Sequence, residues 1–354
     1  MRQIPRVDVN LFAYNGAATV GAAIESVLAQ TWDRLSLTLI DDGSDDGTAE
    51  ICARYARADA RVRVLRHRVN GGAVAAFQRA FWLGEADYVL PKSGDDMLAP
   101  DFIQEIMAVL LAHPDTVMCH AQGLIFAGSG DVRGAYPAEH SLMAIGADPV
   151  ARASHVMARY TSSPSFWGIY RRDAVDRLAR IRYRAGWDHA LLAELALYGE
   201  IRHVAAPLYW RRDGGKPVSV LARAATERGS RGLAVTHPMT EPHWHMPLLT
   251  TALAHLETFS VARVPEEVRA AAMHAAIDIF RGRWLPYLRR EAAVLPALVA
   301  ACERNNDPSL PGSWSRRGLV DLLLAARMIL PEEADCADLL ARLVAPLSIQ
   351  RVAA

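Results

Sequence analysis

The sequence predicts an α/β fold built on a mostly parallel sheet with helices on both faces. Over the first 120 residues, short segments rich in Val, Leu and Ile alternate with segments of helical periodicity. Strands separated by helices of about a dozen residues pair in parallel, because the connection must cross over the sheet. Polar clusters follow each predicted strand, at the carboxyl ends where ligands bind in such sheets.

The helical segments are identified by the spacing of their apolar residues. Between residues 17 and 30 these residues repeat at helical spacing, namely Val20, Ala23, Ile24, Val27 and Leu28. Thr48 is a candidate N-cap of the second helix, because its hydroxyl can accept a first-turn N–H. The predicted strands are residues 7–14, 35–42, 62–67 and 86–91, and the predicted helices are residues 17–30, 47–59, 71–84 and 101–114.

The pattern is looser beyond residue 115. A bent strand or strand pair is predicted over residues 116–128, loop over 128–141, helices over 148–160 and 187–201, and a strand that starts at 202. Gly199 is a candidate C′ residue. We expect one domain over residues 1–222, with halves 1–120 and 121–222, and a mostly helical region over 223–354 that packs on it.

Composition excludes several classes of protein. Lys and Arg number 39, as do Asp and Glu, so there is no electrostatic case for nucleic acid. The four cysteines form no CxxC pair, which suits a reducing compartment. No apolar segment is long enough to span a membrane, and the N-terminus has no signal-peptide pattern. These features predict a cytoplasmic protein.

Four polar clusters mark the carboxyl edge of the predicted sheet. They are Tyr14-Asn15-Gly16, Asp41-Asp42-Gly43-Ser44, Asn70-Gly71-Gly72 and Ser93-Gly94-Asp95-Asp96. Each is also the composition of an ordinary turn, so a single cluster decides nothing. Four on one edge indicate a shared site. The glycine patterns of dinucleotide-binding and P-loop proteins are absent, which argues against a dehydrogenase or methyltransferase.

The segments "AYNGAATVGAAIESVLAQTW", "IDDGSDDGTAEI", "NGGAVAA" and "SGDDMLAP" together resemble the family-2 inverting glycosyltransferases of the GT-A fold. The resemblance covers roughly residues 5–105 and continues more weakly to about 220. It implies transfer of a sugar from a nucleoside-diphosphate donor, UDP above all, with a Mn²⁺ or Mg²⁺ ion. The acceptor, whether saccharide, lipid-linked, peptide or small molecule, stays open.

The resemblance assigns the nucleotide site to the first three clusters. Tyr14 matches the residue that stacks on the base, with Ala13 and Asn15 beside it, and Asp42 matches the acceptor of the base imide. Asn70, Gly71 and Gly72 match the loop that closes over the nucleotide. The alternatives are core packing for Tyr14, a turn cap for Asp42 and an ordinary turn for the loop.

The fourth cluster matches the family's acidic metal motif. The resemblance makes Asp96 the metal ligand and gives Asp95 the ribose or a metal-bound water. Hard oxygen ligands suit Mg²⁺ and Mn²⁺. Ser93 replaces the first acid of many members, and Phe77-Gln78 stands where many have Arg-Asn. The alternative is a solvated turn.

The carboxylate of "GWDH" matches the general base of the family. Asp188 would deprotonate the attacking hydroxyl, or it caps the helix that follows. Arg211 and Arg212, with Lys216, lie where a loop closes over the donor phosphates, and a solvated basic loop is the alternative. His243 and His245 are weak metal candidates.

Some assignments stay open at this stage. Trp167 and Tyr170 are either acceptor platforms or structural. Trp284, Tyr287 and Leu288 belong to a membrane-surface face, or to a packed helical subdomain or homo-oligomer face. The second hypothesis for the whole chain is a non-catalytic protein that binds nucleotide sugars and kept the fold, since it lacks two family features.

Overall fold

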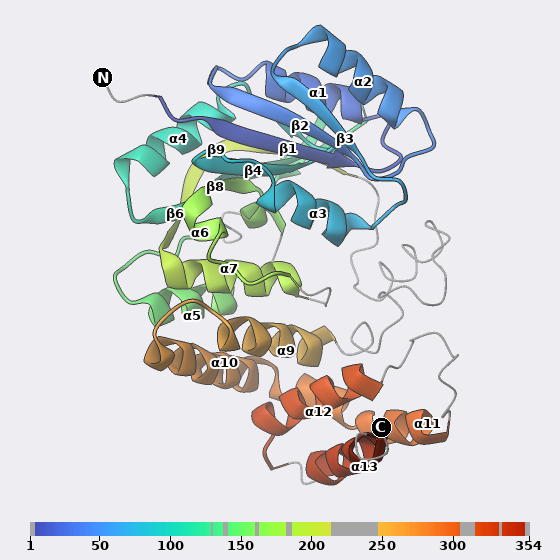
Figure 1. Ribbon diagram of the computed structural model, residues 1–354. Helices are drawn as coiled ribbons and strands as arrows, with labels where there is room; N and C mark the ends of the chain where they lie inside the picture. The colour runs from blue at the N-terminus through green and yellow to red at the C-terminus, as the bar shows by residue number, and fades with distance from the viewer. Residues whose placement is uncertain are drawn as a thin grey trace. The chain divides into compact units, whose positions relative to one another are not determined.

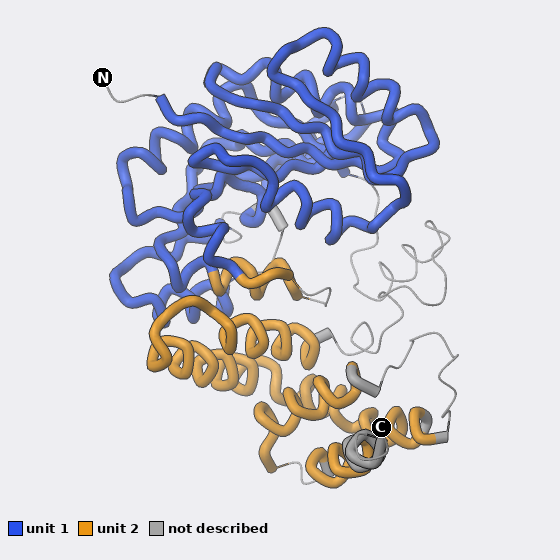
Figure 2. The backbone as a smooth tube through the Cα atoms, viewed as in Figure 1, with its two compact units in different colours: residues 1–178, 195–214 blue, residues 179–194, 215–354 orange. Residues whose placement is uncertain are grey.

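The computed structural model describes residues 4–128, 130–136, 141–159, 163–181, 186–213, 247–304, 316–332 and 335–350. The chain divides into two compact units, which Figure 2 colours separately. Unit 1 comprises Met1–Leu178 and Leu195–Gly214, and unit 2 comprises Ala179–Glu194 and Gly215–Ala354. The predicted boundary at residue 222 lies outside the described residues, and the packing of the C-terminal region on the first domain stays a prediction.

Unit 1 is built on one mixed sheet. Its strand order, within the described residues, is β3-β2-β1-β4-β8-β6-β9-β5, with β7 paired to β6 (Figure 1). The strands are β1 Val7–Ala13, β2 Leu35–Asp41, β3 Val62–Arg66, β4 Tyr88–Ser93, β5 Met97–Leu98, β6 Thr116–Ala127, β7 Asp131–Ala135, β8 Gly168–Arg171 and β9 Glu200–Arg212.

The first half of the sheet is parallel, as the sequence predicts. Strand β1 pairs in parallel with β2 and β4, and β2 pairs in parallel with β3. The register places Ala13 opposite Asp41 and Phe12 opposite Ser93, so the predicted clusters emerge at one edge. The second half is mixed: β8 runs antiparallel to β4 and β6, and β9 runs parallel to β6 but antiparallel to β5.

Helices cover both faces of this sheet (Figure 1). Val7, Val9 and Leu11 of β1 point to one face and belong to a buried core shared with helices α1, α2 and α4. The alternate residues point to α3, where Asn10 donates to the Ala80 carbonyl at 2.7 Å. The helices of unit 1 are α1 Val20–Leu28, α2 Thr48–Ala58, α3 Ala73–Trp82, α4 Phe102–Ala112, α5 Pro149–Arg159, η2 Ser163–Phe166 and α6 Arg172–Val175, with the last turn of α7 Trp187–Tyr198.

Three local predictions are wrong. The segment predicted as loop over 128–141 contains β7, which pairs with β6. Thr48 is the first residue of α2, and Gly47 is the N-cap residue. The Thr48 hydroxyl instead accepts the Gly16 N–H of the loop after β1. Gly199 has no left-handed φ; a Cβ there would come within 2.5 Å of the Asp115 carbonyl, so close approach requires the glycine.

Unit 2 is helical, as predicted for the C-terminal region. Unit 2 contains the first turns of α7 and five further described helices. These are α9 Pro247–Ser260, α10 Glu266–Ala292, α11 Leu295–Arg304, α12 Arg316–Ile329 and α13 Asp335–Gln350. Its core includes Phe259 and Phe280. Leu288 is fully buried, which removes it from the suggested membrane-surface face, whereas Tyr287 is 56% exposed.

None of the helices in the described ranges combines the length and the hydropathy that a membrane span requires.

Gly168, the first residue of β8, gives a direct test of this packing. A Cβ there would lie 2.4 Å from the Cys119 carbonyl oxygen and 3.0 Å from the His120 Cβ, both on β6. We expect Gly168→Ala to lower the free energy of unfolding by about 1–3 kcal/mol, measured by urea denaturation. Gly282→Ala is the control, because no heavy atom lies within 4 Å. Loss of glycine's freedom should stabilise α10 by about 0.5–1 kcal/mol. Equal stability of Gly168→Ala and wild type would contradict the register of β8.

Candidate active site

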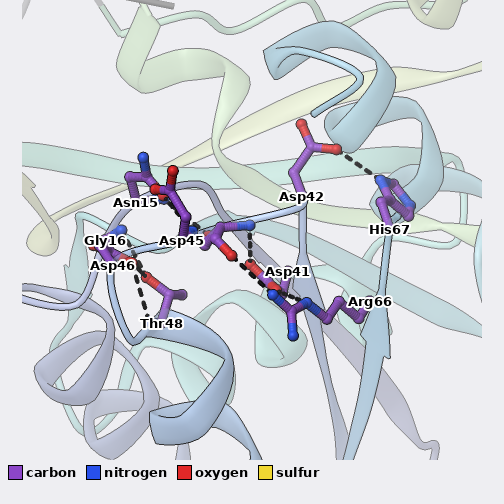
Figure 3. A network of polar contacts seen from close by, with 10 residues as sticks. Asn15, Gly16, Asp41, Asp42, Asp45, Asp46, Thr48, Arg66 and His67 are labelled. Atoms are coloured by element: carbon purple, nitrogen blue, oxygen red, sulfur yellow. Dashed lines mark hydrogen bonds and ion pairs between the residues drawn. The ribbon is translucent and has the colours of Figure 1, made fainter. Parts of the chain in front are cut away.

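The loops after β1, β2 and β4 meet at the carboxyl edge of the sheet. The Asn15 N–H donates to the Ser44 hydroxyl at 2.9 Å, and the Gly94 N–H donates to the Phe12 carbonyl at 2.9 Å. Asn15 has a φ of 48°, a left-handed conformation that Asn adopts more readily than most residues. Sequence clusters far apart in the chain therefore form one polar surface, shown in part in Figure 3.

Tyr14 lies at this edge and is 36% exposed. Core packing, the alternative weighed for it, therefore does not account for the side chain. Ala13, the last residue of β1, is only 8% exposed and continues the core to the base of the loop. An exposed aromatic ring can stack on a flat ligand, so the role of Tyr14 in base binding stays a prediction.

The Asp42 carboxylate organises the loop that follows β3. Asp42 is 1% exposed, and it accepts the Gly71 N–H at 3.1 Å and the Gly72 N–H at 3.0 Å. His67 Nδ1 lies 2.7 Å from the same carboxylate (Figure 3). The predicted contact of Asp42 with a base imide is thus joined by a second role, and a carboxylate has capacity for one more donor.

The Asn70-Gly71-Gly72 loop needs its glycines. Gly72 has a φ of 87°, and its N–H also donates to the Asn70 side chain at 2.8 Å. Gly43 approaches from the β2 loop with a φ of 78°, and a Cβ there would lie 2.8 Å from the Asn70 nitrogen. Left-handed backbone and contact between two main chains both favour glycine. The conformation of this loop therefore depends on specific glycines and contacts, unlike that of a generic turn. Its contact with nucleotide stays a prediction.

The adjacent aspartates of the fourth cluster have different surroundings. Asp95 is exposed and accepts the Thr19 hydroxyl at 3.1 Å. Asp96 is 5% exposed, and its two oxygens accept the Tyr209 hydroxyl at 2.5 Å and the Arg212 N–H at 2.9 Å. Burial raises the pKa of the Asp96 carboxyl, while the Lys92 ammonium opposes that shift. The pair is thus one solvent-facing acid and one structural acid.

Lys92, which the sequence analysis missed, is fully buried beneath this loop. Its ammonium donates to the Ser93 carbonyl at 3.0 Å and to the Asp96 carbonyl. Burial lowers the pKa of Lys92 to about 8, and the charges of Asp96 and Asp95 limit the fall. The ammonium therefore stays mostly charged at neutral pH. A lysine inside an otherwise apolar strand was the available signal.

These residues do not fit the divalent ion that the resemblance implies. Both Asp96 oxygens already have protein donors, and the side chain faces β9. Nowhere in the described ranges do three or more His, Cys, Asp or Glu side chains gather, so an ion here would depend on ligands from the donor phosphates. Ser93 serves the turn, since its hydroxyl accepts the Asp95 N–H at 3.3 Å. Metal binding at Asp96, with or without Asp95, stays a prediction.

Arg211 and Arg212 end β9 beside the acid loop. The Arg212 Nε donates to the Asp95 carbonyl at 3.0 Å and its Nη1 donates to the Gly128 carbonyl at 2.6 Å. Arg211 donates to the Tyr136 hydroxyl. Both arginines thus lie at the end of a strand and contact the protein, and their predicted role at the donor phosphates stays a prediction. Lys216, His243 and His245, also considered from the sequence, lie outside the described residues.

Asp188 belongs to the part of α7 in unit 2. The helix begins at Trp187, and the Gly186 carbonyl accepts the Ala190 N–H at 3.0 Å. Asp188 is therefore inside the first turn and is not the N-cap residue, and both its role as base and a role in satisfying first-turn N–H groups stay open. Its Oδ1 accepts the His189 N–H at 3.0 Å.

A buried histidine pair holds this first turn. His255 Nδ1 lies 2.7 Å from the Thr251 carbonyl and must donate to it. Burial lowers the pKa of His255 to about 4, so it is neutral at pH 7 and its Nε2 accepts. The His189 Nδ1, at 2.7 Å, is then the donor to it. The backbone beside Asp188 is thereby fixed within unit 2.

Tyr170 and Phe77 are buried in the core, whereas Trp167 is half-buried and packs on a core ring. Tyr170 is fully buried and donates to the Phe166 carbonyl at 2.5 Å, so it cannot stack on an acceptor. Trp167 stacks on Tyr209 with ring centres 6.1 Å apart and an interplanar angle of 3°. Phe77, which stands near the family's usual Arg-Asn, is 2% exposed and stacks on Phe81. That position is used for packing in this chain.

The fold and the polar edge define a GT-A-type α/β domain. The model of Glycosyl transferase family 2 matches residues 9–175, so this part of the chain is similar to that family. An uncharacterized glycosyltransferase, YibD of Escherichia coli K12, is 28% identical over 192 residues, which are 53% of this chain and 55% of YibD. Glycosyltransferase GlyG of Streptococcus pneumoniae serotype 4 is 31% identical over 100 residues, which are 28% of this chain and 33% of GlyG. The chain thus spans about half or less of these relatives.

Solved structures also resemble the chain. S. aureus TarS 1-349 in complex with UDP-GlcNAc aligns over 93% of this chain and 92% of TarS, with 14% identity and a TM-score of 0.49. The mannosyltransferase PcManGT from Pyrobaculum calidifontis, in complex with GDP-Man and Mn²⁺, aligns over 94% of this chain and 89% of its own, with 17% identity and a TM-score of 0.42.

The role of Asp42 in its loop is testable by hydrogen exchange. Asp42→Ala removes the acceptor of the Gly71 N–H and one of two acceptors of the Gly72 N–H, so both amides should exchange faster, Gly71 more than Gly72. We also expect the free energy of unfolding to fall by about 1–3 kcal/mol, because the hydrogen bonds to a buried carboxylate are lost. Asp45→Ala, at an exposed neighbour, should change stability by less than about 0.5 kcal/mol. Unchanged protection of both glycine amides in Asp42→Ala would refute the assignment.

Proposed function

We propose that this chain is an inverting glycosyltransferase that moves a sugar from a nucleoside-diphosphate sugar to an acceptor nucleophile. The observation that carries the proposal is the single polar edge made by the loops after β1, β2, β3 and β4 in a family-2 domain. Tyr14, Asn15 and the Asn70-Gly71-Gly72 loop would hold the nucleoside, and Arg211 and Arg212 would face the phosphates.

The reaction we propose is one in-line displacement. The acceptor oxygen forms a bond to C1 of the donor sugar while the bond from C1 to the diphosphate oxygen breaks, which inverts C1. Asp188 takes the proton of the acceptor hydroxyl. Positioned bases of this kind contribute typically ~100- to 10,000-fold to the rate. The diphosphate leaves as an anion, and nearby positive charge stabilises it.

UDP is the nucleotide that the resemblance favours, and calorimetry tests it. Titration with UDP, GDP and dTDP, with and without Mn²⁺, should give saturable heat for UDP with the highest affinity. Tyr14→Ala should weaken that binding by about 1–3 kcal/mol, the range found for base–aromatic stacking. Tyr55→Ala, on α2 within unit 1, is the control and should bind as wild type. If none of the three nucleotides binds in either buffer, the proposed function is wrong.

Asp188→Asn separates catalysis from donor binding. Turnover should fall by ~100-fold or more, whereas donor affinity should stay nearly the same, because a base acts mainly in the transition state. Loss of first-turn charge should cost α7 only about 0.3–1 kcal/mol. Glu266→Gln makes the same change in the first turn of α10 and should leave turnover intact. A folded Asp188→Asn protein with wild-type turnover would remove Asp188 from catalysis.

The second candidate is a non-catalytic protein that binds nucleotide sugars. Ser93 in place of an acid, and Asp96 engaged by Tyr209 and Arg212, favour it. It differs from an enzyme in one measurable respect: purified protein would bind donor but release no nucleotide from a panel of donor sugars and acceptors. Nucleotide release that depends on Asp188 would exclude it.

A further inference from the structure

Two cationic side chains contact the loop that carries Asp95 and Asp96. Lys92 lies under the loop, fully buried, and donates to two of its carbonyl groups. Arg212 lies beside the loop, where its guanidinium donates to the Asp95 carbonyl at 3.0 Å. A buried ammonium persists only where the surrounding groups compensate its desolvation. For Lys92 these groups are the carbonyls of Ser93 and Asp96.

The charges in this loop balance without an added ion. In their ionised forms, Asp95 and Asp96 carry two negative charges, and Lys92 and Arg212 carry two positive charges. A divalent cation is attracted to a surplus of carboxylates, which this arrangement does not offer. A diphosphate instead requires positive charge with hydrogen-bond donors, and a guanidinium carries five donors in a planar fork, two of which Arg212 uses on the Asp95 and Gly128 carbonyls.

The geometry of Arg212 keeps its guanidinium in place. Its Nη1 donates to the Gly128 carbonyl at 2.6 Å, and its Cζ lies 4.6 Å from the ring centre of Phe126. Its backbone N–H donates to Asp96 at 2.9 Å, so the residue is anchored at both ends. An arginine fixed in this way loses little conformational freedom on binding an anion, which favours affinity.

We propose that Arg212, supported by Lys92, binds the donor diphosphate through its guanidinium in this chain, so that a nucleoside diphosphate binds without a divalent cation. This inference rests on the proposed function, since it concerns the same donor. It differs from the sequence expectation, in which Mn²⁺ or Mg²⁺ held by Asp96 has that role. The specificity-determining residue is Arg212, and Lys92 is a positioning residue that acts through the loop.

Calorimetry with UDP in EDTA, and again in Mn²⁺, tests the inference. Wild-type protein should bind UDP in EDTA, with an affinity within about threefold of that in Mn²⁺, a difference under about 1 kcal/mol. Affinity in EDTA should also fall as salt rises, because exposed charge contacts are screened. Arg212→Gln should weaken binding in EDTA by at least about tenfold. Arg212→Lys, which keeps the charge but loses the fork, should fall between the two.

Arg57→Gln is the matched control, because Arg57 is an exposed arginine on α2 and its loss changes net charge equally. It should bind UDP as wild type does.

Binding of UDP by wild type only in Mn²⁺ would overturn the inference and leave the proposed function standing. Wild-type affinity of a folded Arg212→Gln protein in EDTA would overturn it too. No binding in either buffer would reject the proposed function and the inference together. If Arg212→Gln fails to fold, the wild-type comparison of EDTA with Mn²⁺, and its salt dependence, decide the matter.

Discussion

The Asp96 carboxylate is the constraint on which the carboxyl edge of unit 1 depends. It accepts hydrogen bonds from Tyr209 and Arg212, which lie 113 and 116 positions further along the chain. Because a buried carboxylate without donors is costly, the end of β9 must lie against the loop after β4. The two-residue strand β5 pairs with β9 at the same place, Met97 with Trp210 and Leu98 with Tyr209. Arg212 reaches Asp95 only because this closure exists.

Buried carboxylates repeat this role elsewhere in unit 1. Asp42 fixes the loop after β3 through two glycine N–H groups, and Asp8 accepts the N–H groups of Glu85 and Ala86 at 3.0 and 2.9 Å. In each case the acid satisfies main-chain donors of a segment about 30 to 80 positions away. The carboxylates of such acids are hydrogen-bond acceptors for main-chain N–H groups, whether or not they also bind a ligand. Aspartates at a strand end are therefore incomplete evidence for a ligand site until their own donors are known.

The local pattern predicts the parallel half of the sheet, because apolar periodicity and turn residues are properties of short segments. The mixed half depends on contacts between distant segments, which periodicity does not contain. That is why β7 was assigned to a loop and the engagement of Asp96 was not foreseen. His67 was missed for the same reason, since its partner Asp42 lies on another strand. Lys92 had a local signal, a charge in a buried strand, that the resemblance to a metal motif obscured.

The two chemical roles that we propose are encoded by separate contacts. The donor edge depends on hydrogen bonds within unit 1, chiefly those of Asp42 and Asp96. The first turn of α7, which carries Asp188, depends on His189 and His255 within unit 2. No residue belongs to both sets, and changes that share no partner have additive effects on free energy. Substitutions that change how unit 1 binds the donor diphosphate are therefore expected to leave the first turn of α7 intact.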